Sequence, residues 1–118
     1  MSISFAITAY NEHEELQVLL NQLEQIAKPD DEIVIQLDSK ATPEVLSLVD
    51  QFISKDFTFT VKKCVFDLNN HFADFKNNLK SYCTKDWVFQ IDADETLSET
   101  FSRVIHEVLE ANDGIDLI

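Results

Sequence analysis

Three carboxylates lie within four positions, Asp92, Asp94 and Glu95, directly after an apolar run that begins at Trp87. Carboxylates held this close repel one another, and the pKa of at least one rises unless a cation lies among them. Oxygen ligands suit Mg²⁺ or Mn²⁺, which proteins hold through one or two carboxylates together with the phosphate oxygens of a substrate. The segment therefore indicates a divalent-cation site for a phosphorylated ligand. A solvated acidic turn ahead of a helix is the structural alternative.

A hydrolytic interpretation of the same segment is also open. Asp92-x-Asp94-x-Thr96 fits the D-x-D-x-T pattern of haloacid-dehalogenase-like phosphatases, in which the first Asp is a nucleophile and the second a general acid/base. That pattern normally lies near the start of its domain, whereas Thr96 lies late in this sequence. An EF-hand loop counted from Asp92 is rejected, because its sixth and twelfth positions hold Leu97 and Arg103 instead of Gly and Glu.

The composition narrows the class of protein. The chain has 118 residues, with 22 Asp and Glu against 9 Lys and Arg, and a formal net charge of −13. Without a basic stripe, it is not expected to offer a surface for nucleic acid or an anionic membrane. The length and the hydrophobic fraction of 45% predict one packed domain over residues 1–118. Because Gly114 is the single glycine, the P-loop and the G-x-G-x-x-G motif are excluded.

The cysteine content and the hydropathy predict the compartment. Cys64 and Cys83 are too few for a disulfide framework and are expected to be buried thiols in a reducing environment. The N-terminus has no basic leader, and no apolar run approaches the roughly 20 residues of a membrane span. We therefore expect a soluble, cytoplasmic chain.

The periodicity of apolar residues predicts the elements that position the acidic segment. Alternating or continuous apolar runs predict strands over about 2–9, 32–38, 57–61 extending toward 66, 87–91 and, incompletely, 115–118. Spacings of three and four residues predict helices over about 12–27, 43–53, 70–83 and 98–111. Asn11 and Glu14 form a capping pair for the first helix, and Pro43 suits the first turn of the second.

Strand and helix alternate throughout, which predicts an α/β fold: a mostly parallel, Rossmann-like sheet with helices on both faces, in three layers. In such sheets ligands bind beyond the carboxyl ends of the strands. This rule selects four loops, which span residues 8–12, 38–42, 67–70 and 92–96.

The segments beside these loops resemble a known family. ISFAITAYNEHEELQVLL (3–20), IVIQLDSKAT (33–42) and FADFKNNLKSYCTKDWVFQIDAD (72–94) are similar, in this order, to motifs of inverting family 2 glycosyltransferases with the GT-A fold. The similarity is closest to the branch that builds lipopolysaccharide cores.

The resemblance implies a nucleotide-sugar donor, with a UDP-sugar favoured, and a role for each matching residue. Ala9, Tyr10 and Glu12 would line the base and ribose pocket, Asp38 would contact the base, and Lys76 would approach the nucleotide. Asp92 would face the ribose or the water shell of a metal. Asp94 would ligate Mn²⁺ or Mg²⁺, which would bridge the diphosphate and act as a Lewis acid.

In that family the part after the D-x-D motif carries the acceptor site and the general base. The chain is therefore expected to be a donor half truncated after Asp94, with an unidentified glycan, lipid or protein acceptor and no nameable general base. A third interpretation is a non-catalytic module that self-associates, or pairs with a partner chain, through the unfinished strand at 115–118.

Overall fold

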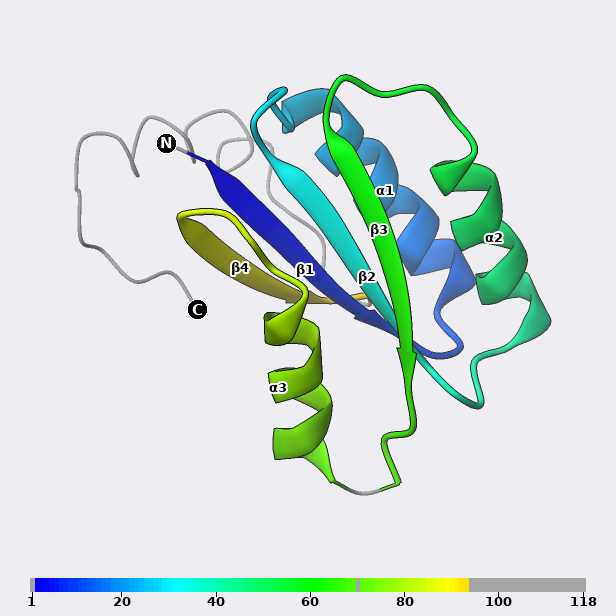
Figure 1. Cartoon of the computed structure of the whole chain (residues 1–118). Helices are drawn as coiled ribbons and strands as arrows, with labels where there is room; N and C mark the ends of the chain where they lie inside the picture. The colour runs from blue at the N-terminus through cyan, green and yellow to red at the C-terminus, as the bar shows by residue number, and fades with distance from the viewer. Residues whose placement is uncertain (1, 70, 94–118) are drawn as a thin grey trace.

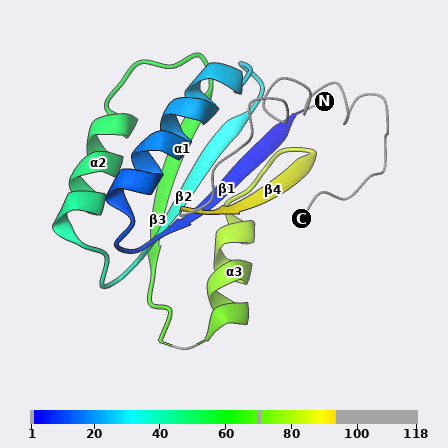
Figure 2. The same ribbon diagram turned by 180° about the vertical axis from the view of Figure 1, so that it is seen from behind.

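The computed structural model describes residues 2–69 and 71–93, which form a parallel four-stranded sheet between helices (Figure 1). The elements are β1 (Ile3–Ala9), α1 (His13–Ile26), β2 (Glu32–Asp38), α2 (Pro43–Ile53), β3 (Thr60–Phe66), α3 (Phe72–Ser81) and β4 (Trp87–Asp92). The strand order is β3-β2-β1-β4. Helices α1 and α2 cover one face and α3 the other (Figure 2). The predicted three-layer α/β fold is confirmed, while the helix and strand predicted over 98–111 and 115–118 lie outside the described residues.

The two faces of the sheet differ in chemistry, because successive side chains of a strand point to opposite faces. The side chains of β1 and β2 that face α1 and α2 are apolar and fully or almost fully buried: Ile3, Phe5, Ile7, Ile33, Ile35 and Leu37. The opposite face carries a small apolar cluster of Ala6, Val34 and Leu79 together with buried polar side chains from the same strands. The large core therefore lies under α1 and α2, and α3 covers the polar face.

The first two helices begin in different ways. Thr42 caps α2 by accepting a hydrogen bond from Val45 N at 3.4 Å, and Pro43 occupies the first turn as predicted. The predicted capping of α1 by Asn11 and Glu14 is wrong. Its N-cap is Glu12, which makes no side-chain capping bond, because Glu12 Oε1 accepts from Tyr10 N and Asn11 N at 2.7 Å each. No helix in the described part of the chain is long and apolar enough to cross a membrane.

The segment before β3 alternates like a strand but is not one. Phe57 stacks on Phe59 at 4.7 Å between ring centroids and contacts Phe52 at the end of α2 at 4.8 Å. Pairing with β2 starts only at Thr60. The aromatic alternation at 57–59 therefore reflects packing against α2 rather than sheet hydrogen bonding, and the predicted strand starts three residues too early.

A buried carboxylate, Glu32, lies at the amino-terminal ends of the strands. Glu32 is 1% exposed, and its carboxylate accepts from Ser4 Oγ at 2.6 Å and Thr84 N at 2.7 Å. Lys62 Nζ lies 2.7 Å from Oε1. Burial by itself raises the pKa of Glu32, but the hydrogen bonds from Lys62, Ser4 and Thr84 outweigh it and lower the pKa to about 2. The charged form of Glu32 therefore joins β1, β2 and β3 to the loop after α3.

Candidate functional site

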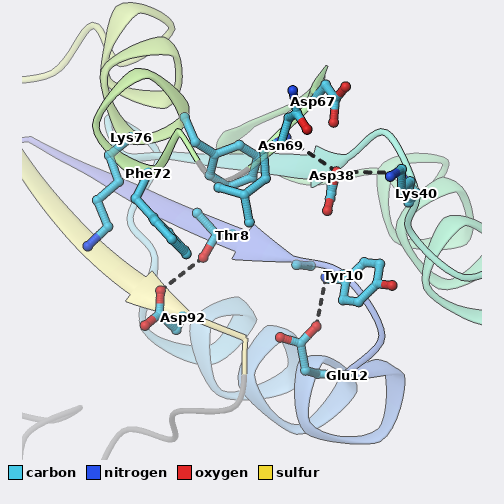
Figure 3. A pocket seen from close by; sticks show the side chains of 13 residues that line it. Thr8, Tyr10, Glu12, Asp38, Lys40, Asp67, Asn69, Phe72, Lys76 and Asp92 are labelled. Carbon is cyan, nitrogen blue, oxygen red and sulfur yellow. Dashed lines mark hydrogen bonds between the residues drawn. The ribbon is translucent and has the colours of Figure 1, made fainter.

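A cavity of about 560 Å³ lies at the carboxyl edge of the sheet. Its wall combines the ends of all four strands with the first turns of α3 (Figure 3). The lining residues are Thr8, Ala9, Tyr10, Glu12, Asp38, Lys40, Asp67, Leu68, Asn69, Phe72, Phe75, Lys76 and Asp92. Six of the residues selected from the sequence are thus brought together in one cavity: Ala9, Tyr10, Glu12, Asp38, Lys76 and Asp92. The seventh, Asp94, lies outside the described residues.

Backbone hydrogen bonds fix the loop after β1 between its neighbours. Thr42 N donates to Tyr10 O at 2.9 Å, and Ala93 N donates to Thr8 O at 3.0 Å. Thr8 Oγ1 also donates to Asp92 Oδ1 at 2.9 Å, as Figure 3 shows. Tyr10 is 44% exposed and lines the cavity, where its ring is available for contact with a planar group.

Asp38 joins the loops after β2 and β3. Its Oδ1 accepts long hydrogen bonds from Lys40 N and Leu68 N, both at 3.4 Å. The carboxylate is half-buried on the cavity wall. Because β2 and β3 are paired up to Asp38 and Phe66, their ends present these loops side by side. Asp38 is therefore placed both to shape the cavity and to accept hydrogen bonds from a ligand.

The turn between β3 and α3 brings further residues to the cavity. Asn69 has a φ of 39°, a left-handed conformation that asparagine tolerates better than most residues. His71 N donates to Leu68 O at 2.7 Å and closes the turn. Phe72 follows at the start of α3 and is 62% exposed, so this cavity wall offers an apolar surface.

Sequence reasoning assigned no role to several lining residues: Thr8, Lys40, Asp67, Leu68, Asn69, Phe72 and Phe75. Five of them fall within the loops that the rule on strand ends had selected. Phe72 and Phe75 belong to the first turns of α3, and only the packing of this helix over the sheet brings them to the cavity.

The described residues of the cavity wall carry more negative than positive charge. Among them, the carboxylates are Glu12, Asp38, Asp67 and Asp92, and the cations are Lys40 and Lys76. A diphosphate would therefore meet net repulsion unless a cation accompanied it. Among the described residues no three His, Cys, Asp or Glu side chains are grouped to hold a metal ion. Asp92, at the end of β4, carries carboxylate oxygens, the hard donors that Mg²⁺ and Mn²⁺ prefer.

Two comparisons by sequence match this chain to known proteins. The family model described as Glycosyl transferase family 2 matches residues 4–116. The lipopolysaccharide core biosynthesis glycosyltransferase LpsC of Rhizobium meliloti (strain 1021) is 30% identical over 115 residues, which cover 98% of this chain and 40% of LpsC.

Solved structures of S. aureus TarS share the fold. TarS 1–349 superposes with a TM-score of 0.73 at 21% identity over 93% of this chain and 33% of that one. The same protein in complex with UDP gives a TM-score of 0.73, and a further TarS structure gives 0.76 at 18% identity over 94% of this chain and 20% of that one. The chain thus spans about two fifths of LpsC and a third or less of the TarS chains.

Proposed function

The chain belongs to glycosyltransferase family 2, and from this premise we propose that its cavity binds a nucleoside diphosphate sugar, with a UDP-sugar as the favoured donor, for transfer to an acceptor. The observation that carries the proposal is the convergence of six matching residues on one cavity at the carboxyl edge of the sheet. Solved TarS in complex with UDP, which has the same fold, supports the choice of nucleotide.

The nucleoside end of the donor is assigned to the side of the cavity that carries Tyr10, Glu12 and Asp38. The exposed Tyr10 ring offers a surface for a base or ribose. Asp38 and Glu12 provide acceptors for the N–H group of a base and for ribose hydroxyls. Lys76 on α3 offers a positive charge near the phosphates.

The diphosphate end is assigned to Asp92 and to a divalent cation held with Asp94. Mn²⁺ or Mg²⁺ bound there would neutralise the charge that develops on the departing nucleoside diphosphate. Thr8 holds one oxygen of the Asp92 carboxylate at 2.9 Å and so orients it at the end of β4. The excess of carboxylates over lysines on the cavity wall supports a requirement for such a cation.

The experiment is calorimetric titration of the purified chain with UDP in Mn²⁺ and in EDTA. Wild type is compared with Asp94→Ala, Asp92→Asn and the control Asp30→Ala, an exposed carboxylate in the turn before β2. We expect binding in Mn²⁺, its loss in Asp94→Ala, weakening in Asp92→Asn and no change in Asp30→Ala. Absence of UDP binding in both conditions would overturn the nucleotide site, and binding insensitive to Asp94→Ala would overturn the metal assignment.

Membership of glycosyltransferase family 2 argues against the phosphatase interpretation of Asp92 and Asp94. One further assay tests the alternative of a non-catalytic module. UDP binding without hydrolysis of any UDP-sugar, together with concentration-dependent self-association, would favour the non-catalytic module.

A further inference from the structure

Helix α3 has a small apolar contact with the sheet. Phe75 and Leu79 are its buried residues, and Leu79 joins Ala6 and Val34 in the small cluster on that face. By contrast, α1 buries four leucines in the main core: Leu16, Leu19, Leu20 and Leu23. The Phe75 ring also contacts Phe66 of β3, at 6.1 Å between ring centroids. Apolar packing of this kind is non-directional, so the orientation of α3 depends on directional contacts as well.

Gln36 supplies such a contact. This β2 side chain is fully buried at 0% exposure. Its Nε2 donates to Phe75 O at 2.6 Å, and its Oε1 accepts from Asn78 Nδ2 at 2.7 Å. The weak donor Cys64 Sγ lies 3.5 Å from the same oxygen. One amide thus binds both the backbone and a side chain of α3.

The position of Gln36 links this contact to the cavity. Gln36 is in register with Thr8, and Thr8 is in register with Asp92, so the three lie in one row on the α3 face. Phe75 O, which Gln36 binds, belongs to the residue before Lys76. Since Phe75 and Lys76 are consecutive residues of one helix, a rotation or shift of α3 at Phe75 also moves Lys76.

Lys76 is sensitive to such a change. It lines the donor cavity and also a neighbouring cavity of about 250 Å³, whose wall includes Gln90 and Leu79. Lys76 thus lies where the two cavities meet, and a rotation or shift of α3 would change its position relative to the donor cavity.

We propose that Gln36 is a positioning residue of the donor site, which through its hydrogen bonds to α3 sets where Lys76 and Phe72 stand over the cavity. The proposal rests on the proposed function for its ligand. Gln36 touches no ligand itself and acts through the helix.

The chain contains a matched control on the same strand. Glu32 is also buried, faces the same side of the sheet and binds Thr84 in the loop after α3. It lies at the amino edge, away from the cavity. A substitution of Glu32 therefore destabilises the region around α3 but leaves the hydrogen bond between Gln36 and Phe75 O in place. It shows how far a general loss of stability affects UDP binding.

The test measures UDP affinity in Mn²⁺ for wild type, Gln36→Leu, Lys76→Met, the double variant and Glu32→Gln. Removing the buried amide hydrogen bonds is expected to weaken UDP binding about tenfold in Gln36→Leu. In the Gln36→Leu background, Lys76→Met is expected to weaken UDP binding further by less than about twofold, because the lysine is already misplaced. Glu32→Gln is expected to lower thermal stability and leave affinity within about twofold. Three results would overturn the proposal. The first is a UDP affinity of Gln36→Leu equal to that of wild type. The second is a loss of affinity in the double variant equal to the product of the two single losses, and the third is a loss in Glu32→Gln as large as that in Gln36→Leu.

Two additions keep the test decisive. If Gln36→Leu does not fold, Asn78→Ala removes the partner of Oε1 from a half-buried position, and a smaller loss of affinity of about threefold is expected. A second measurement does not need a ligand. The NMR chemical shifts of the backbone amides, recorded without nucleotide, report the position of α3 directly. Gln36→Leu should shift the amides of residues 72–79 and Glu32→Gln should not. If wild type binds no UDP, the proposed function fails, while these shifts still decide whether Gln36 positions the helix.

Discussion

Glu32 makes the stability of the chain sensitive to acid. Its pKa is lowered from 4.5 to about 2 in the folded protein. A lowered carboxyl pKa contributes stability that is fully present above the unfolded pKa and is lost as the pH falls through the folded one. The free energy of unfolding is therefore expected to fall by roughly 3 kcal/mol between about pH 5 and pH 2 from this group. Denaturant titrations at several pH values measure it.

The matched variant for that titration is Glu32→Gln, which keeps the shape and removes the charge. It should be less stable than wild type at pH 7 and should lose less stability on acidification. An identical pH dependence in the two proteins would assign the acid sensitivity to other carboxylates.

The two cysteines are expected to be poor nucleophiles. Burial, and secondarily the nearby Cys83, raises the pKa of Cys64 to about 11. Burial, followed by the nearby Glu32, also raises the pKa of Cys83, which is half-buried. Since the thiolate is the reacting species, Cys64 should be alkylated at pH 8 more than about 100-fold slower than a free thiol. Mass spectrometry of iodoacetamide-treated protein checks this, with Cys64→Ala to assign the sites, and rapid labelling of Cys64 would contradict it.

At the residue scale, the sequence predicts which side chains follow the strand ends, but not which partners they find. Tyr10, Asp38 and Asp92 were selected because the ends of parallel strands meet at one edge, and the structure brings them together. Gln36 could not be selected. Its position is an ordinary one in a buried strand, and its importance comes from Phe75 and Asn78, about forty positions away in the sequence. No local pattern records such a contact.

At the element scale, the packing of α3 on the sheet should depend on Leu79. Leu79 is 1% exposed in a cluster with few other members. Leu79→Ala is expected to cost about 2–4 kcal/mol in free energy of unfolding, by lost burial and an unfilled cavity. The control is Val18→Ala on α1, where the side chain is 48% exposed and the cost should stay within about 0.5 kcal/mol. Urea denaturation compares them, and similar midpoints for the two variants would argue against the assigned packing of α3.

Periodicity predicts the elements well where burial is one-sided or complete. The continuous apolar run of β2 is buried along its length, and the leucine stripe of α1 lies in the core. It fails where apolar residues alternate for another reason, as at Phe57 and Phe59, which stack on each other. The capping pattern, by contrast, fails at the start of α1, where the Glu12 carboxylate accepts a hydrogen bond from Tyr10 N in the preceding turn. The conformation of residues 57–59 depends on tertiary packing, and the N-cap of α1 depends on competing local hydrogen bonds. Patterns in the sequence include neither.

At the scale of the whole molecule, a net charge of −13 opposes the binding of another anion. Without a divalent cation, the diphosphate should add nothing favourable to the binding of a nucleoside, because carboxylates outnumber lysines on the cavity wall. In EDTA, uridine is therefore expected to bind at least as tightly as UDP, and in Mn²⁺ UDP should gain at least about tenfold over uridine. Competition titrations in both buffers measure the ratio. A UDP preference that persists in EDTA would show that lysines alone suffice for the diphosphate.

Successive side chains of β2 point to opposite faces of the sheet, so the register of this strand against β1 and β3 affects both the stability of the fold and the binding of a ligand. Ile35 and Leu37 enter the large core, while Gln36 between them holds the helix beside the cavity. A slip of β2 by one residue would exchange the faces, placing an amide among the leucines and an isoleucine against α3. An insertion or deletion within β2 would thus abolish folding and ligand binding together.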